Sequence, residues 1–479
     1  MEPATAGPRT RPRKTKNTPT ETTRMQPSHR YTRLTAIALG IAGVISFGSA
    51  GASGFQIREN SVKNQGRAFA GSAVAKDDAS VVSNNPAAMV NLDSTTVRTD
   101  VTVIDLTAKF RGGGTSAAGT PLTGGNGGDP GDAQPVPALA IVVPLSGAFD
   151  KVTLGASVSA PFGLKTEYDR DWVGRYHAVE SDVKTIDLTL SAAVALTDRF
   201  SVGFGVVYER AEVTLTSAAD LGSLICSGNP ACRSPASPFG PQRNDGLVDV
   251  TGDDNGLGWL VGFQFKPTDK LSIGYSHRSE IDHDISGTVD FTVPAAVAGA
   301  AAGNPVLAAR IADGPGGAKL TTPSVDTLSV SYAFTDNFRM MADVQATDWH
   351  SLREVDIRRH NALNSQVSFE DFEWEDTMMY ALGAEFDLND AFTLRAGAAY
   401  DETPTNDRTR TPRLPDNDRM LYSVGLTWNA SEHLSVDAAY TRIEIDSPSI
   451  DVRNSTGAHL VGKFKGHADL FGIAAQYKF

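Results

Sequence analysis

The last thirteen residues, 467–479, alternate strictly between two kinds of side chain. Every second residue is apolar, and these are Phe471, Ile473, Ala475, Tyr477 and Phe479; the residues between them are Gly472, Ala474, Gln476 and Lys478. A period of two places the two sets on opposite faces of a β-strand. An apolar outer face and an aromatic carboxyl-terminal residue are typical of a closed barrel in an outer membrane, where lipid replaces the core. A buried edge strand of a soluble sheet is the alternative for this segment alone.

Composition favours the barrel. The chain has 479 residues and a mean hydropathy of only -0.20, and no apolar run after residue 52 is long enough for a membrane helix. In a barrel wall, apolar lipid-facing residues alternate with polar lumen-facing residues, so the mean hydropathy of a strand stays low. A soluble chain of this length would instead be expected to divide into two or three domains.

The one continuous apolar stretch, residues 34–47, predicts a secretory signal peptide. Arg30 and Arg33 precede it and Ser49-Ala50-Gly51-Ala52 follow it, so cleavage is expected after Ala52. A membrane anchor is the alternative, but the stretch is short for a span. We assign residues 25–52 to the signal peptide and residues 1–24, which precede Met25, to an upstream extension from a misassigned start.

The mature chain is strongly acidic. Residues 1–52 hold eight of the 43 Lys and Arg and two of the 56 Asp and Glu, so their removal leaves a formal net charge of about -19. This charge disfavours polyanionic partners, and no nucleic acid is expected to bind.

The only two cysteines, Cys226 and Cys232, are separated by five residues. In an exported protein this spacing predicts a disulfide at a loop tip. A metal site would need further ligands, and none is near, so we expect neither a metal nor a cofactor.

Six short polar turns divide the chain into alternating segments, and longer connections lie between them. The turns are residues 146–150, 197–199, 266–270, 335–337, 389–391 and 429–433, and the long connections are roughly 111–134, 217–254, 291–324, 402–418 and 447–461. Short turns at one rim and long loops at the other are typical of outer-membrane barrels. Six turns account for twelve strands, and the strand near Val97 and the last strand make fourteen. We therefore expect an all-β membrane protein, a 14-stranded antiparallel transmembrane β-barrel.

Two of the long loops are unexpectedly apolar. Residues 295–311 are expected to form one or two short helices, and residues 218–225 add a second apolar run. Exposed apolar patches usually mark a binding surface. The candidates for an extracellular hydrophobic groove are Leu221, Leu224, Ile225, Val297, Val306 and Leu307. Packing of the loops on one another over the barrel mouth is the alternative, and the two hypotheses are compatible.

Residues 53–92 do not have the pattern of a membrane strand. They are rich in small and polar residues and contain Lys76, Asp77, Asp78 and the run Asn84-Asn85-Pro86-Ala87. Such a segment must lie in the periplasm or in the lumen, where its polar groups find partners. We expect it to plug the barrel formed by residues 93–479, because an open lumen of fourteen strands would leak.

Several motifs along the mature chain are shared with one family. They are Gly54-Phe55-Gln56-Ile57, Gly66-Arg67-Ala68-Phe69-Ala70-Gly71, Asp77-Asp78-Ala79-Ser80, Asn85-Pro86-Ala87, Pro161-Phe162-Gly163-Leu164, Tyr275-Ser276-His277-Arg278-Ser279-Glu280, Leu414-Pro415-Asp416-Asn417-Asp418-Arg419 and the last strand. On these residues the chain resembles the FadL-type (OmpP1/FadL/TodX-like) outer-membrane transporters of long-chain fatty acids and other hydrophobic compounds. The resemblance implies a fourteen-stranded barrel plugged by an amino-terminal hatch. It also implies passive uptake through a loop groove, a lumen pocket, hatch movement and a lateral opening at a kink in the third strand.

The resemblance also implies roles for particular residues. Asn85, Pro86 and Ala87 would belong to the gating part of the hatch, and a generic Asn-Pro turn is the alternative. Pro161, Phe162 and Gly163 would form the kink, because proline lacks the ladder N–H and glycine permits a bend. The alternative is that Pro161 simply ends the strand. Leu414, Pro415, Asp416, Asp418 and Arg419 would form the family loop motif.

Expected partners follow from the same resemblance. They are long-chain fatty acids or other hydrophobic small molecules, the lipid and lipopolysaccharide of the outer membrane, and the barrel assembly machinery, which would recognise Phe479. A fatty acid carboxylate calls for a cation in the lumen, and the candidates are Arg278, Arg339, Arg353, Arg358 and Arg419. None of them is unambiguous, so neutral aromatic or aliphatic hydrocarbons stay open as substrates.

The sequence fits two other functions less well. An outer-membrane phospholipase would need a nucleophile beside a histidine, but His277, His283, His350, His433 and His467 are scattered, and we expect no enzyme. A plugged porin for polar solutes would show basic ladders and an acidic constriction loop, and the apolar loops argue against it.

Overall fold

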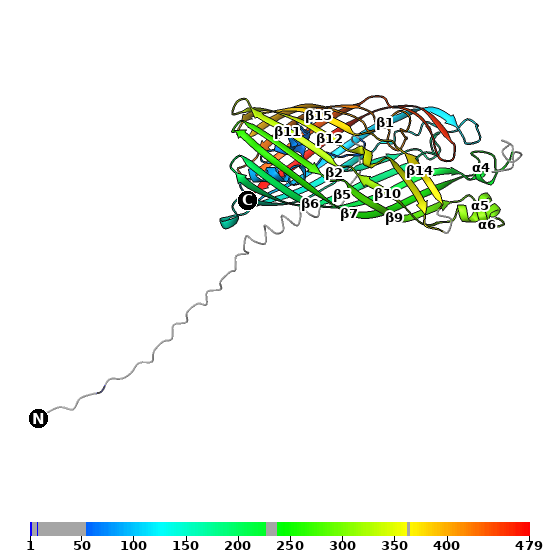
Figure 1. The fold of residues 1–479 in the computed structure, drawn as a ribbon, viewed down its shortest axis with the longest axis horizontal. Coiled ribbons are helices and arrows are strands. Elements are labelled where there is room, and N and C mark those ends of the chain that lie inside the picture. Colours follow the sequence, from blue (N-terminus) through cyan, green and yellow to red (C-terminus); the bar gives the residue numbers. More distant parts are fainter. Residues whose placement is uncertain (2–6, 8–53, 227–236, 362–364) are drawn as a thin grey trace. The chain divides into compact units, whose positions relative to one another are not determined.

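The chain forms a closed antiparallel β-barrel. The computed structural model describes residues 1, 7, 54–226, 237–361 and 365–479. Its twenty strands belong to one sheet (Figure 1), which closes on itself because β1 (Thr96–Thr115) pairs with both β2 (Ala133–Pro144) and β20 (His459–Lys478).

Fourteen strands make the wall, because six of its members are each divided into two successive strands. The divided members are β3 (Val152–Ser159) with β4 (Gly163–Glu167), β8 (Leu271–Arg278) with β9 (Ile281–Thr292), β10 (Gly314–Thr322) with β11 (Val325–Ala333), β12 (Phe338–Thr347) with β13 (Glu354–Arg359), β14 (Gln366–Asp371) with β15 (Thr377–Asn389), and β18 (Leu434–Ile445) with β19 (Ser449–Arg453). The undivided members are β1, β2, β5 (Glu180–Thr197), β6 (Phe200–Asp220), β7 (Asp245–Thr268), β16 (Phe392–Asp401), β17 (Arg419–Asn429) and β20. The predicted fold and strand count are confirmed.

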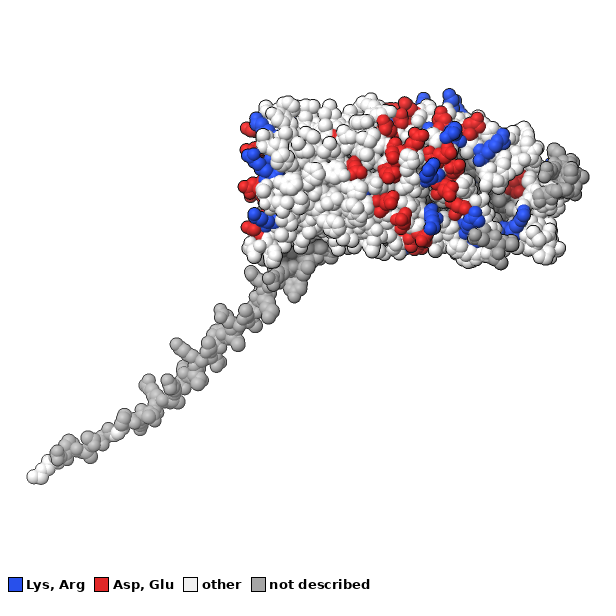
Figure 2. Space-filling model, in the orientation of Figure 1, with Lys and Arg blue, Asp and Glu red and all other residues white. Residues whose placement is uncertain are grey.

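The two faces of the wall follow the alternation in the sequence. In β20, Phe471 and Ile473 are 55% and 62% exposed, whereas Ala474 between Ile473 and Ala475 is buried. Figure 2 shows a band almost free of charge between charged side chains at one rim and a belt of charges near the middle of the barrel. This band is the part of the wall that faces lipid. No helix within the described residues has the length and apolarity to cross a membrane.

The six short turns lie where the sequence predicts them, but the long connections are only partly right. Residues 291–324 are not one loop, because β10 begins at Gly314, and β19 likewise lies inside the predicted loop 447–461. Two further connections, residues 168–179 between β4 and β5 and the turn between β13 and β14, complete the outer rim. Strands that rise above the membrane face water on their outer side, so the apolar alternation that marks the membrane part of a strand fades there.

Three short helices stand at the outer end of the barrel (Figure 1). They are α4 (Leu221–Ile225), α5 (Ala295–Ala301) and α6 (Pro305–Arg310). The last two confirm the prediction of short helices in residues 295–311.

The amino-terminal segment, residues 54–92, precedes β1 and consists of short helices joined by turns. They are α2 (Val62–Gln65), η1 (Ser72–Val74), α3 (Val81–Asn84) and η2 (Pro86–Asn91). These helices contact the inner sides of strands all around the barrel, among them β5, β6, β7, β11 and β18. The predicted extension 1–24, the predicted signal peptide 25–52 and Cys232 lie outside the described residues, apart from Met1 and Gly7.

Candidate functional site

Buried charge pairs fix the amino-terminal segment inside the barrel. Arg67 Nη1 lies 2.6 Å from Glu385 Oε1 of β15, and Arg58 Nη1 lies 3.0 Å from Asp401 Oδ2 of β16. Asp78 of the segment is in turn paired with Arg98 of β1 at 3.3 Å. A buried charge that loses its partner is costly, so these pairs hold the segment in one position.

Asn85, Pro86 and Ala87 lie directly against the wall. The Asn85 side chain donates to the carbonyl of Ala73 (2.7 Å) and to that of Phe263 on β7 (3.1 Å), and it accepts from the amide of Ala87. A Cβ at Gly203 of β6 would come within 2.4 Å of the Ala87 nitrogen. The motif therefore links the segment to β6 and β7, and its role in gating stays a prediction.

The third wall strand is broken at Pro161, Phe162 and Gly163. β3 pairs with β2 as far as Val158, whereas β4 pairs only with β5. Within the described part of the chain, residues 133–138 of β2 therefore have β1 as their only strand partner. Pro135 and Pro137 fall in this half-paired stretch, as proline does at sheet edges. The wall thus has a gap in its hydrogen bonding between β2 and β4.

The beginning of the amino-terminal segment pairs with this break. The amide of Ile57 donates to the carbonyl of Pro161, and the amide of Gly163 donates to that of Phe55, both at 2.7 Å. The rings of Phe55 and Phe162 meet edge to face with centroids 5.6 Å apart. The segment and the kink are therefore joined by backbone hydrogen bonds and by ring packing.

The family loop motif anchors the same end of the segment. Asp416 Oδ2 accepts from the amide of Gly54 at 2.9 Å, and Arg419 pairs with Asp416 Oδ1 at 2.5 Å. Asp418 accepts from the Tyr400 hydroxyl, while Leu414 and Pro415 line cavities in the lumen. The motif thus holds Gly54 beside the kink.

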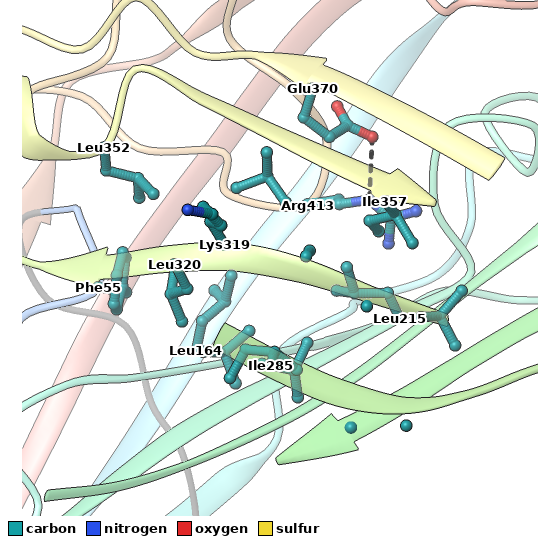
Figure 3. Close-up of a pocket in the computed structure, with 18 of the residues that line it drawn as sticks. Phe55, Leu164, Leu215, Ile285, Lys319, Leu320, Leu352, Ile357, Glu370 and Arg413 are labelled. Carbon is teal, nitrogen blue, oxygen red and sulfur yellow. Dashed lines mark hydrogen bonds and ion pairs between the residues drawn. The ribbon is translucent and has the colours of Figure 1, made fainter. Parts of the chain in front are cut away.

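An apolar cavity, whose lining includes Leu164 of β4, lies next to the kink (Figure 3). Its lining comes from the wall strands β4, β5, β6, β7, β9 and β10, from β13, β14 and residues next to them, from Arg413 and Leu414, and from Phe55. Its apolar side chains include Leu164, Val183, Val213, Ile285, Leu320, Leu352, Phe372, Trp374 and Leu414. Phe55 packs against Trp374 with ring centroids 5.9 Å apart, so the amino-terminal segment closes one end of the cavity.

One ion pair lies in this apolar lining. Arg413 and Glu370 both line the cavity, and Arg413 Nε lies 3.4 Å from Glu370 Oε1 (Figure 3). Burial raises the pKa of Glu370, while the nearby Arg413 opposes this rise. The sequence analysis missed Arg413, although it stands next to the loop motif, because nothing in the sequence tells which loop side chains turn inward.

The arginines that the sequence suggested as carboxylate ligands are all bound elsewhere or lie outside the cavity. Arg278 pairs with Asp187 and Glu209, Arg339 with Glu385 and Asp387, and Arg358 with Asp356; Arg353 is exposed. Arg419 holds Asp416, as described above. None of the five lines the apolar cavity, and Arg278 instead lines a more polar cavity beneath the kink together with Asn60 and Asn84.

The predicted groove residues meet at the outer rim. Leu221, Val297 and Leu307 are buried in one cluster formed by α4, α5 and α6, with Leu224 and Ile225 packed against it, while Val306 is 65% exposed. The two loops therefore pack on each other, and a groove between them stays a prediction. Cys226, the last residue before the gap in the described chain, is buried. Its predicted disulfide partner Cys232 lies outside the described residues.

The histidines that the structure describes lie in separate places and form no catalytic group. They pair in separate places, for example His277 with Asp326 at 3.0 Å and His283 with Glu209 at 3.0 Å. Within the described residues, one group of possible metal ligands comes together, Asp348, His350 and Asp376, whose ligand atoms lie within 4.8 Å of one another. All three are exposed, and His350 already pairs with Asp376 at 2.8 Å.

Comparison with known proteins gives one consistent result. The model of the family described as "Outer membrane protein transport protein (OMPP1/FadL/TodX)" matches residues 43–479. Outer membrane protein P1 of Haemophilus influenzae is 28% identical over 92% of this chain and 98% of its own length. The long-chain fatty acid transport protein of Salmonella typhi is 28% identical over 94% of this chain and 99% of its own.

Solved structures agree with the sequence relatives. A Pseudomonas aeruginosa FadL homologue superposes with a TM-score of 0.81 at 28% identity, over 89% of this chain and 99% of the other. The toluene transporter TodX of Pseudomonas putida, at 15% identity, shares the fold with a TM-score of 0.62, over 87% of this chain and 97% of the other. Proteins of this family are outer-membrane transport proteins and not enzymes. The chain belongs to the OmpP1/FadL/TodX family of outer-membrane transport proteins.

Proposed function

We propose that this protein takes up long-chain fatty acids or similar hydrophobic molecules across the outer membrane by passive transport. The observation that carries the proposal is the position of the apolar cavity: it lies beside the break between β3 and β4, where the wall lacks hydrogen bonds to β2. A water-filled pore gives an apolar chain no burial energy, whereas burial in such a cavity contributes about 0.8 kcal/mol for each CH₂.

Transport along this route has four steps. The apolar outer helices collect the molecule, the cavity accepts it, the amino-terminal segment shifts as a hatch, and the molecule leaves through the gap into the membrane. The hydrogen bonds from Ile57 and Gly163 support coupling between the last two steps, because displacement of Phe55–Ile57 would free the edge of β4. Asn85, Pro86 and Ala87 would hold the hatch at rest through their contacts with β6 and β7.

Neutral hydrocarbons are the second candidate substrate class. The lining of the cavity is apolar except for the Arg413–Glu370 pair, Lys319 and Thr251, and structural relatives include toluene transporters. Lipopolysaccharide is proposed as a contact of the charged belt, and the barrel assembly machinery as the partner that recognises Phe479 during insertion. A plugged porin for polar solutes is disfavoured by the apolar cavity.

Uptake assays test the proposal. Cells that express the wild-type chain should accumulate radiolabelled oleate or toluene faster than cells with an empty vector, and Asn85→Ala should reduce the rate several-fold. Asn84→Ala is the matched control, because the Asn84 side chain bonds within the segment, to Asn60, and not to the wall. If the folded barrel, recognised by its heat-modifiable migration on gels, gives no uptake of either compound, the proposal is wrong.

A further inference from the structure

A second stretch of the wall lacks hydrogen bonds, between β10 and β13. These two strands form only two residue pairs within the described part of the chain, at Gly316 and Gly317 of β10. Residues 318–322 of β10 continue to pair with β9, and residues 354–357 of β13 continue to pair with β14, but the two edges do not pair with each other. Five residues of a strand extend about 17 Å. We call this stretch the side opening.

The side opening is closed at both ends. Toward the outer rim, the side chain of Arg359 on β13 donates to the carbonyl of Ala312 at 2.8 Å, just before β10 begins. Toward the membrane, the amide of Asp348 donates to the carbonyl of Ser324 at 3.1 Å, and the neighbouring Trp349 is fully buried. The side opening is therefore a bounded hole in the backbone pairing and not a free sheet edge.

The apolar cavity lies directly behind the side opening. Three residues from each edge line it (Figure 3), namely Ala318, Lys319, Leu320, Leu352, Val355 and Ile357. The side chain of Lys319 is 89% exposed and lies 3.8 Å from Asp284 on the outer surface of β9. Because Lys319 both lines the cavity and stands exposed on the outer surface, the cavity reaches the outside of the wall between β10 and β13.

Charged side chains surround the outer side of this opening. Lys319 and Asp284 lie on one side of it, and Arg358 pairs with Asp356 at 2.6 Å on the other. The side opening therefore lies outside the uncharged band that faces lipid. Water can hydrogen-bond to the unpaired backbone groups at this level, whereas in lipid each of them would cost several kcal/mol.

The outer helices stand next to the side opening. Only residues 311–313 separate α6 from β10, and Val306 on α6 is 65% exposed. A molecule held on the exposed face of α6 is therefore close to the opening without having to pass between the packed helices. The edges of the opening offer it apolar side chains, and each buried CH₂ contributes about 0.8 kcal/mol.

We propose that the side opening is an entrance to the apolar cavity, through which hydrophobic molecules pass from the outer surface of the barrel between β10 and β13. This inference rests on the proposed function and adds the route by which its substrates reach the cavity. Leu164 of β4 lines the same cavity beside the proposed exit. The cavity thus connects an entrance in the water-facing part of the wall with an exit at different strands.

The entrance is tested by blocking it after the full-length mature protein has folded in nanodiscs. Lys319→Cys is labelled with a bulky stilbenedisulfonate maleimide, and stopped-flow quenching of tryptophan fluorescence by 9,10-dibromostearate reports binding, because Trp374 lines the cavity. Association and dissociation should both slow about tenfold while the dissociation constant stays unchanged, since a blocked passage changes both rates equally.

Labelled Asp284→Cys is the matched control, because Asp284 is exposed beside Lys319 but does not line the cavity. It should bind at the rate of the wild-type protein treated with the same reagent. Unchanged association in labelled Lys319→Cys, or equal slowing in both labelled variants, would overturn the entrance. A weaker dissociation constant with unchanged association would also overturn it, since Lys319 would then act on binding and not on access.

The opening itself is tested by the reactivity of cavity-lining positions in intact cells. Val355→Cys, at the edge of β13, should react with the same membrane-impermeant maleimide. Ile285→Cys lines the cavity behind β10, where Ile285 is only 8% exposed, and should react about tenfold more slowly. Protection of both cysteines would show that side chains close the opening and would contradict the proposal.

The failure of this inference is distinguishable from failure of the proposed function. If the wild-type protein takes up oleate or toluene but the labelled Lys319→Cys variant binds and transports at the same rate, only the side entrance is wrong. If the wild-type protein neither binds nor takes up any of these compounds, the proposed function itself is wrong.

Discussion

Two neighbouring regions of the barrel wall differ in backbone hydrogen bonding: one is paired throughout, and the other is left unpaired on one side. At the seam, β1 and β20 pair without interruption from Thr96↔Lys478 to Thr115↔His459, over all twenty residues of β1. On the other side of β1, the outer half of β2 faces β4 without a single pair between them. A closed barrel hides every strand edge from lipid, and this one leaves an edge open where an apolar cavity meets the wall.

The difference shows where the barrel tolerates unpaired backbone. At the gap, Pro135, Pro137 and Pro161 have no backbone N–H that could be left unpaired. The break also changes the alternation: odd residues of β3, such as Ser157 and Ser159, are buried, whereas in β4 the buried side chains include Leu164 and Thr166. The seam contains no proline and keeps one alternation over its twenty pairs, so it closes the barrel, whereas the gap is the proposed exit.

The largest effect is expected from breaking the seam. β20 is paired with β1 on one side and β18 on the other, so Ile473→Pro removes a ladder hydrogen bond whichever way its N–H points. An unpaired backbone group in the bilayer costs several kcal/mol, and we expect the heat-modifiable barrel to be lost. Ile473→Ala, which keeps the N–H, should assemble. Normal assembly of the Ile473→Pro variant would show that an unbroken seam is not required for closure.

Closing the gap should abolish uptake and spare assembly. Deletion of residues 160–162 removes the kink and, because three is an odd number, restores one continuous alternation through β3 and β4. β4 can then pair with β2, and uptake of oleate or toluene should fall to the level of cells with an empty vector. Pro161→Ala alone should have a much smaller effect. Undiminished uptake by the deletion variant would exclude the gap as the exit.

A smaller effect is expected from removal of the hydrogen bond that joins the amino-terminal segment to the gap. Ile57→Pro removes the N–H that donates to the Pro161 carbonyl, a hydrogen bond of 2.7 Å. A lost hydrogen bond of this kind costs about 1–3 kcal/mol, so hydrogen exchange in residues 55–60 should be accelerated roughly tenfold or more. Ile57→Val is the control. Unchanged exchange would mean that ring packing of Phe55, and not the backbone bond, holds the segment at the kink.

The smallest effect is a pH dependence in residues 168–179, the connection that follows the gap. Burial, assisted by the charges of Arg413 and His459, lowers the pKa of His177 to about 3, below its usual 6.5. The folded connection therefore keeps its full stability above pH 6.5 and loses it as the pH falls from 6.5 toward 3, because the unfolded form binds the proton more readily. Proteolysis of this connection should become faster between about pH 7.5 and about pH 4, and His177→Gln should remove most of that change. Equal pH dependence in both proteins would show that other groups control it.

Much of the wall is readable from the sequence. Tight turns and a period of two locate all fourteen strands, since a lipid-facing strand must alternate and each hairpin needs polar residues at its turn. The outer extensions such as β10 and β19 are not readable in this way, because strands surrounded by water on their outer side need no apolar stripe.

The candidate site, too, is only partly predictable from the sequence. Pro161 and Gly163 mark the break from sequence, because proline and glycine have restricted places in a strand. Arg413 could not be found in this way, because nothing in the sequence tells which loop side chains turn into the cavity.

The sequence by itself therefore determined the class of structure. The chain is exported and acidic, its alternating strands close into a barrel, and its amino-terminal segment is not a strand of the wall. The physical reason is that exclusion of water by lipid acts on every strand locally, residue by residue. Only the tertiary structure decided which strands remain unpaired at β2 and β4 and which cation enters the apolar cavity. Those features depend on cross-strand register and on loop conformation, which are set by contacts between residues far apart in the chain.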